Sequence, residues 1–171
     1  MTYVDIPVDR PIEEKISWAH NCLDRCKDTL LNDKKTASLL KRFREASAEG
    51  LKEMVEIGLV EECRRCEEEE GGACCGAGIE NRYSGTLLLI NLLLGVELPD
   101  SAPDPKSCFF LGPGGCSLRA RHVICVNYIC RKITDSIPEQ MINDLREMEG
   151  EALDMLFILN EQIKSVLREI K

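Results

Sequence analysis

The hydrophobic pattern of the first part of the chain has the period of an amphipathic helix. Apolar side chains return every three or four residues, which places them on one face of a helix. Asp9 and Pro11 suit the first turn, because aspartate can cap free N–H groups and proline needs no donor there. We therefore predict a helix that Asp9 caps and that ends near Asn32. Its apolar face consists of Ile12, Ile16, Ala19, Leu23, Cys26 and Leu30.

Two further long helices follow from the same period. After a polar break at 32–35, an apolar stripe predicts a helix over about 36–60, which Gly50 weakens by about 1 kcal/mol relative to alanine. This helix would carry Cys63 just beyond its end. From Pro138 onwards a third helix keeps an apolar seam in which Glu149 is the one polar position. The seam consists of Ile142, Leu145, Glu149, Ala152, Leu156, Leu159, Ile163, Val166 and Ile170.

Shorter helices are expected between these long ones. Ser84 can cap a helix over about 86–96. A further short helix is predicted within 117–132, beyond the turn at 112–115. The apolar run at 87–98 is interrupted by Asn91 and is far shorter than the ~20 residues that span a bilayer. We therefore predict a buried element of a soluble protein and no contact with a membrane.

The predicted fold is all-α and forms a single domain over residues 1–171. Three long amphipathic helices have to bury their stripes against one another, so we expect a bundle with an irregular cysteine-rich region packed at one end. The frame of this bundle comprises 10–60 and 138–171, and the cysteine-rich region comprises 61–133. Both Trp18 and Phe157 are expected in the core. A chain of this length can bury roughly 70% of its unfolded surface without crosslinks.

Composition and compartment restrict the function. Lys and Arg number 22 against 30 Asp and Glu, which gives a formal charge of -8. An acidic chain lacks the basic footprint of a nucleic-acid binder, so no nucleic-acid partner is expected. The N-terminus has no basic segment followed by an apolar one, and we therefore expect a cytoplasmic protein. In a reducing compartment, the ten cysteines indicate metal ligands or catalytic thiols more than disulfides. Their even number leaves a disulfide framework as an alternative.

Eight cysteines cluster between residues 63 and 130 and are the candidate metal ligands. Thiolate sulfur is a soft ligand that selects zinc, copper(I) or iron–sulfur clusters, and a C-x2-C turn directs two sulfurs to one point. The predicted cofactor is Zn2+ or a [4Fe-4S] cluster, and the sequence does not distinguish them. The candidate ligands are Cys63, Cys66, Cys74, Cys75, Cys108, Cys116, Cys125 and Cys130.

The spacing of these cysteines leaves their grouping open. Consecutive side chains of an extended segment point to opposite sides, so Cys74 and Cys75 either serve two sites or include one buried thiol. Cys125 and Cys130 would lie about 140° apart on a continuous helix, so a helix has to break or begin between them if both bind one ion. Eight sulfurs suffice for two four-cysteine sites or for one site with additional core thiols.

Three further residues could take part in the chemistry. Cys22 and Cys26 lie one turn apart on the apolar face of the first helix, and free cysteine is among the most buried residue types. We interpret this pair as core. His122 precedes Cys125 by three residues, and we expect a solvated or capping histidine there. No H-E-x-x-H motif is present, which argues against hydrolytic zinc chemistry.

The cysteine order resembles the CxxCxxCC zinc- or iron-chelating family, the YkgJ-type cysteine cluster proteins. The resemblance covers residues 63–130 and includes Tyr128, two residues before the last cysteine. It implies that the eight cysteines together form the metal site. Two features differ from the family pattern: seven residues separate Cys66 from Cys74, and Val123-Ile124 replaces the usual Arg-Pro. Some relatives are flagellin lysine methylases with a similar cluster.

The leading hypothesis is a cytosolic protein that binds zinc or an iron–sulfur cluster through these thiolates, with no assigned downstream role or protein partner. The alternative is a thiol-redox or protein-modifying enzyme, either an iron–sulfur oxidoreductase or lysine-methylase-like, that uses the same cysteines. A redox pair at Cys63 and Cys66 should begin a helix after a strand, whereas here it follows a predicted helix. The sequence thus favours metal binding and leaves open whether the protein is an enzyme.

Overall fold

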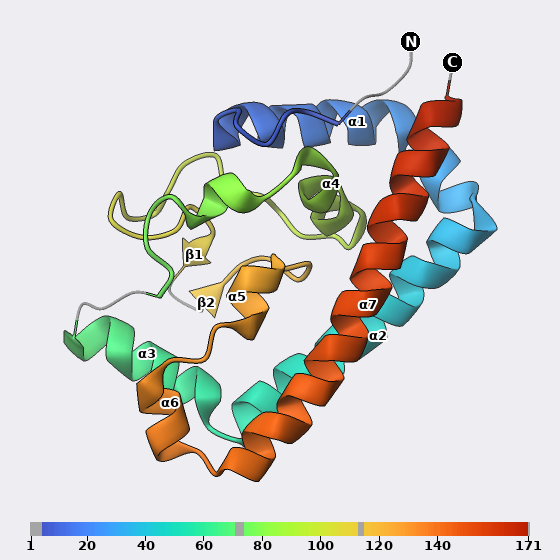
Figure 1. Cartoon of the computed structure of the whole chain (residues 1–171). Coiled ribbons are helices and arrows are strands. Elements are labelled where there is room, and N and C mark those ends of the chain that lie inside the picture. Colours follow the sequence, from blue (N-terminus) through green and yellow to red (C-terminus); the bar gives the residue numbers. More distant parts are fainter. Residues whose placement is uncertain (1–4, 71–73, 113–114, 171) are drawn as a thin grey trace.

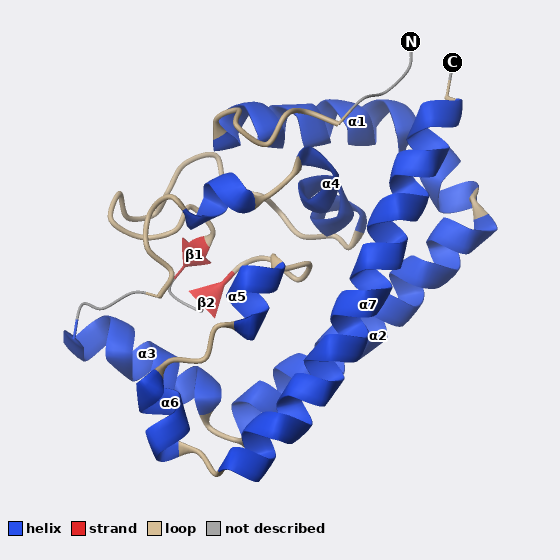
Figure 2. Ribbon diagram, in the orientation of Figure 1, coloured by secondary structure: helices blue, strands red, loops and turns tan. Residues whose placement is uncertain are grey.

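The computed structural model describes residues 5–70, 74–112 and 115–170 (Figure 1). The predicted turn at 112–115 lies partly outside these residues, as do two glycines of the segment between Cys66 and Cys74. Figure 2 shows that helices dominate the fold. The only sheet of the described chain is a pair of two-residue strands. The mostly helical class is therefore confirmed.

The elements follow one another in a simple order. They are α1 (Ile12–Asn32), α2 (Lys34–Glu56), α3 (Leu59–Glu70), the 3-10 helix η1 (Ile79–Arg82), α4 (Gly85–Leu93), β1 (Leu111–Gly112), β2 (Gly115–Cys116), α5 (Val123–Asn127), α6 (Arg131–Ser136) and α7 (Glu139–Glu169). The two strands are antiparallel, and Leu111 pairs with Cys116.

Local chemistry explains where the first helices begin and end. Pro11 precedes α1 without a side-chain cap, so Asp9 does not have the capping role that we predicted. Asp33 separates α1 from α2 and accepts hydrogen bonds from the backbone N–H and the hydroxyl of Thr36, at 2.7 and 2.6 Å. These bonds lower the pKa of Asp33. Gln162 of α7 donates to the same carboxylate at 3.2 Å, so the cap also ties the junction of the two helices to α7.

The predicted helix over 36–60 is in fact two helices. Gly58 has a φ of 79°, a left-handed conformation that glycine adopts without steric cost and that ends a helix. The chain changes direction there, and α3 begins at Leu59. Cys63 and Cys66 consequently lie within a separate helix rather than after the end of α2.

The long helices pack in pairs. The chief partner of α2 is α7, which lies alongside it, whereas α1 packs mainly on α4 and touches α2 and α7 less (Figure 1). The approach of α1 to α4 is close, because a Cβ atom at Gly85 would lie 2.6 Å from Cε3 of Trp18. The predicted bundle of three long helices is therefore not confirmed, since α4 occupies the place that a bundle would give to α2 or α7.

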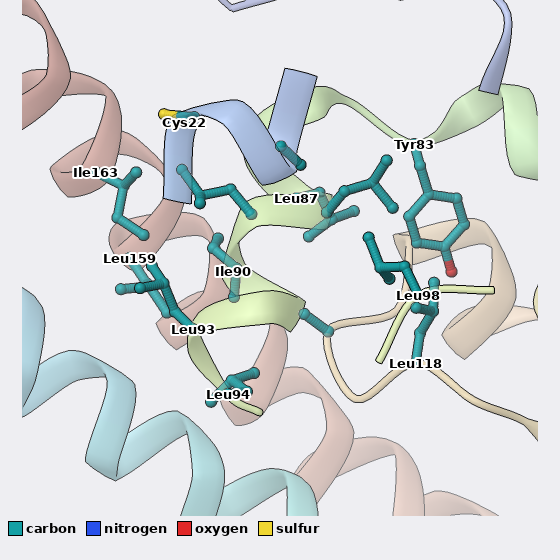
Figure 3. Packing of buried hydrophobic residues seen from close by; sticks show 14 of the residues in the cluster. Cys22, Tyr83, Leu87, Ile90, Leu93, Leu94, Leu98, Leu118, Leu159 and Ile163 are labelled. Carbon is teal, nitrogen blue, oxygen red and sulfur yellow. The ribbon is translucent and has the colours of Figure 1, made fainter. Parts of the chain in front are cut away.

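The main core surrounds α4. Figure 3 shows Leu87, Ile90 and Leu93 of this helix among side chains of α1, α7 and the segments that follow α4. The run that contains α4 is thus buried, as predicted. Trp18 packs against this core, but Phe157 is 69% exposed, so its predicted burial is wrong. Within the described residues, no helix is both long and apolar enough to cross a membrane.

One polar side chain lies at the centre of this apolar region. Asn91 is 0% exposed, and its amide makes four hydrogen bonds of 2.9 to 3.0 Å. Its nitrogen donates to the carbonyl oxygens of Leu87 and Ala120, and its oxygen accepts the backbone N–H groups of Arg119 and Ala120. Asn91 therefore attaches an irregular segment of the cysteine-rich region to α4.

Replacing this amide should destabilise the fold. In Asn91→Leu the side chain keeps its approximate volume, but the buried backbone groups of Ala120 and the part-buried N–H of Arg119 lose their partner. We expect the free energy of unfolding to fall by about 2 to 4 kcal/mol. Urea denaturation followed by circular dichroism measures this loss.

The matched control is Asn21→Leu. Asn21 is exposed and donates to the carbonyl oxygen of Ser17 at 2.9 Å, which is the same backward bond within a helix that Asn91 makes to Leu87. Its replacement should change the free energy of unfolding by no more than about 0.5 kcal/mol. Equal losses in the two variants would contradict the assigned role of Asn91.

Candidate metal centre

The segment between Cys116 and Cys125 is fixed at three consecutive points. Asn91 holds residues 119 and 120, as described above. Nη2 of Arg121 lies 3.1 Å from Oε1 of Glu149 in α7. The backbone N–H of His122 donates to the hydroxyl of Tyr83 at 3.1 Å. These contacts fix the segment against α4, α7 and the turn before α4.

The ion pair with Arg121 explains why Glu149 can interrupt the apolar seam of α7. Glu149 is 8% exposed, and burial raises its pKa, while the neighbouring Arg121 guanidinium acts in the opposite direction. Burying an unpaired carboxylate would cost free energy, so Glu149 can occupy this buried position because it is paired with Arg121. The same guanidinium also lies 3.5 Å from Sδ of Met54 in α2.

A cleft separates the α2–α7 pair from the cysteine-rich region. Its volume is about 1420 Å³, and seven of the eight candidate cysteines line it, all except Cys108. The opposite wall is largely apolar and includes Leu51, Val55 and Leu156. The candidate thiols of distant sequence segments therefore share one cavity, to which solvent and small ions have access.

The first set of neighbouring thiols joins α3 to α6. Cys63 and Cys66 are three positions apart in α3, and residues with this spacing lie on one face of a helix. Cys130 is the N-cap residue of α6 and packs against the small core that Leu59 forms with Ile133 and Ile137. Burial raises the pKa of Cys74, and the neighbouring thiols of Cys130 and Cys66 raise it further. We call Cys63, Cys66, Cys74 and Cys130 the α3 group.

The second set lies beside α4, where Cys75 and Cys108 belong to irregular segments, Cys116 to β2 and Cys125 to α5. The N–H of Cys108 donates to the carbonyl oxygen of Cys75 at 2.6 Å, and the N–H of Leu111 donates to the carbonyl oxygen of Cys108 at 2.9 Å. Leu111 in turn pairs with Cys116 across the two short strands. The thiol of Cys125 lies 3.8 Å from the hydroxyl of Tyr83. We call Cys75, Cys108, Cys116 and Cys125 the loop group.

Besides burial, the pKa values of the thiols are affected mainly by neighbours from the same set. Burial raises the pKa of Cys63, and the thiols of Cys130, Cys74 and Cys66 raise it further. Burial raises the pKa of Cys75 to about 12, and here Cys116, Cys108 and Cys125 contribute, with a smaller effect from Cys74. Each of these two thiols is thus surrounded mainly by its own group.

Positive charges lie next to both groups. Nζ of Lys132 is 3.6 Å from Sγ of Cys66 in the α3 group. The Arg121 guanidinium lowers the pKa of Cys63 and also that of Cys116, although burial raises both more strongly. A single arginine therefore stabilises negative charge in both groups.

The donor chemistry fits a soft cation, but the thiols are not closed around a point. Within residues 5–70, 74–112 and 115–170, no set of three or more His, Cys, Asp or Glu side chains is arranged so that it could hold a metal ion. All ten cysteines are free thiols, so the structure does not support the disulfide alternative. A metal would have to displace the protons and draw the sulfurs together.

The remaining candidate residues have structural positions. Cys22 and Cys26 are each 1% exposed in the main core, which confirms their interpretation as core residues. Nδ1 of His122 accepts the N–H of Ile124 at 3.2 Å and caps α5, as expected. The helix also breaks between Cys125 and Cys130, since α5 ends at Asn127.

Sequence reasoning missed the residues that position the thiols. Tyr83 lies against Phe110, with ring centroids 5.3 Å apart, and its hydroxyl contacts both Cys125 and the backbone of His122. Burial raises the pKa of this hydroxyl, which keeps it protonated and able to donate. The sequence marks Asn91 and Glu149 as unusual, since each is a polar residue on an apolar stripe. No feature of the sequence marks Tyr83.

Comparisons with known proteins found no relative of this chain. No protein-family model matches the sequence. No match was found among the curated proteins or among the solved structures. Membership of the YkgJ-type family therefore stays a prediction that rests on the order of the cysteines.

Proposed function

We propose that this protein binds zinc or an iron–sulfur cluster through thiolates of its cysteine-rich region. The observation that carries the proposal is the arrangement of eight free cysteines, which come from α3, β2, α5, the N-cap of α6 and irregular segments and lie near one another. Soft sulfur donors of this number are typical of such sites. The proposed ligands are Cys63, Cys66, Cys74, Cys75, Cys108, Cys116, Cys125 and Cys130.

The electrostatics of the region support this function. Thiols that raise one another's pKa repel one another once they ionise, and a bound cation removes this repulsion. Lys132 and Arg121 would compensate part of the negative charge of a metal surrounded by thiolates. In this proposal the helical part of the chain is a frame, and residues 61–133 are the metal-holding region beside it.

A thiol-redox enzyme is the weaker candidate. A reactive dithiol needs a low thiol pKa, which a helix N-terminus or a neighbouring cation can provide. Cys63 is instead the fifth residue of α3, and burial raises its pKa. The proposal therefore assigns the cysteines a ligand role, and a partner protein or reaction is not assigned.

Metal analysis of the anaerobically purified protein tests the proposal. We expect at least about one metal equivalent per chain, because four thiolates suffice to enclose one ion or cluster. Visible absorption identifies the metal, since iron–thiolate centres are coloured and zinc–thiolate centres are colourless. Less than one equivalent after reconstitution with both zinc and iron would refute the proposal.

A matched cysteine substitution separates ligands from core thiols. Cys116→Ala should lower the metal content or release the metal to a weak chelator, because a ligand is lost. Cys22→Ala removes the same atoms from the core and should leave the metal content unchanged. A Cys116→Ala protein that retains its full metal content at the wild-type affinity would contradict the ligand role of Cys116.

Removal of the Tyr83 hydroxyl should weaken zinc binding. Tyr83→Phe keeps the packing of the ring on Phe110 but loses the contacts to Cys125 and to the N–H of His122. Outer groups of this kind contribute about 10- to 100-fold to metal affinity. Competition with a chelator of known affinity measures the change. Tyr128→Phe is the control, because Tyr128 is exposed and should have the wild-type affinity.

A further inference from the structure

We infer that the cysteine-rich region holds two separate metal sites, one formed by the α3 group and the other by the loop group. This inference rests on the proposed function and divides its eight ligands. The first site would use Cys63, Cys66, Cys74 and Cys130, and the second would use Cys75, Cys108, Cys116 and Cys125. The boundary between the sites would fall between two adjacent residues, Cys74 and Cys75.

The α3 group is defined by packing between helices. Leu59 at the start of α3 packs with Ile133 and Ile137 near α6, which brings the C-x2-C pair of α3 next to the N-cap of α6. Cys74 lies near this junction, since the thiols of Cys130 and Cys66 add to the effect of burial in raising its pKa. A metal ion at this junction would join two helices that otherwise share only a small core.

The loop group is defined by backbone pairing. Beyond the bond between Cys108 and Cys75, the N–H of Ala77 donates to the carbonyl oxygen of Lys106 at 3.1 Å. The two segments therefore run side by side, and Gly76 forms a bridge with Ser107. This pairing fixes Cys75 to Cys108, and the short strands bring Cys116 near them.

The neighbours of the two adjacent cysteines separate the groups. Cys74 and Cys75 lie in a turn that leads to the bridge between Gly76 and Ser107. Burial and the thiols of Cys130 and Cys66 raise the pKa of Cys74, whereas the backbone of Cys75 is bonded to Cys108. A single site with all eight ligands would require one of these two thiols to leave its neighbours.

Each site would have the composition of a closed tetrathiolate centre. Four sulfurs complete the tetrahedral shell of zinc and leave no position for water, which favours a structural or storage role over hydrolysis. Each closed zinc site of this kind carries about two negative charges. Lys132 lies beside the α3 group, and Arg121 lies near both groups.

The adjacent cysteines provide a matched pair of variants for the test. Full-length apo protein is loaded anaerobically with zinc alone, and the zinc content and the protection of each cysteine from alkylation are measured. Wild type should bind about two zinc ions per chain, because each set of four thiolates encloses one ion. Cys74→Ala and Cys75→Ala should each lose about half of this zinc.

The pattern of protection decides the assignment. Cys74→Ala should expose Cys63, Cys66 and Cys130 to alkylation and leave the loop group protected. The reverse pattern is expected for Cys75→Ala, whereas Cys22→Ala should leave both groups protected. Exposure of the same cysteines in both variants, or only one zinc ion in the wild type, would overturn the two-site inference while metal binding itself stands. Wild type without zinc or any native metal would refute the proposed function as well.

A second measurement needs no substitution and applies if a variant loses its helical circular dichroism signal. Wild type loaded with zinc is treated with increasing chelator, and alkylation is mapped at each step. The four thiols of one group should become reactive together, and those of the other group at a different chelator concentration. Loss of protection in sets that mix the two groups would overturn the inference.

Discussion

The position of the cysteine-rich region depends on a buried amide. The segment from Leu118 to His122 has no regular secondary structure, so its backbone groups need partners elsewhere. Asn91 supplies partners to residues 119 and 120 from within α4, a buried apolar helix. An unpaired backbone or side-chain polar group would cost free energy in this apolar region. The segment is therefore most stable in the register that pairs Asn91 with residues 119 and 120. Cys116 and Cys125 lie on either side of that segment.

The ion pair of Arg121 and Glu149 joins the same segment to the helical frame. Glu149 interrupts the seam of α7, and Gly50 of α2 lies opposite it, with 3.9 Å from its Cβ position to Cγ of Glu149. At this distance a Cβ atom would make an ordinary van der Waals contact with Glu149. The carboxylate of Glu149 holds Arg121, and Arg121 brings positive charge to both thiol groups.

The surroundings of the thiols favour their protonated form. Burial raises the pKa of several of these cysteines, and neighbouring thiols raise it further. These thiols therefore add little negative charge to the region. This differs from the environment of a nucleophilic cysteine, where a cation or a helix N-terminus stabilises the thiolate. It also explains how so many thiols can be neighbours in an acidic chain.

Much of the helical content was predictable, since α1, α4 and α7 correspond closely to the predicted segments and Ser84 caps α4. The 3.6-residue period and local capping chemistry carry this information. The same reasoning failed at Gly58, where one residue in a left-handed conformation divides a periodic stripe into α2 and α3. It also placed Phe157 in the core, because a period shows that a face is apolar but not how wide the covered part is.

The sequence by itself determined the helices, their apolar faces, the core position of Cys22 and Cys26, and the set of eight candidate ligands. Only the tertiary structure decided which helix packs against which and which thiols are neighbours. The physical reason is that helix formation is governed by interactions within a few residues, whereas Cys74 meets Cys130 and Cys75 meets Cys108 through contacts between distant segments. Asn91, Tyr83 and Arg121 likewise act through partners far away in the sequence, which are Ala120, His122 and Glu149.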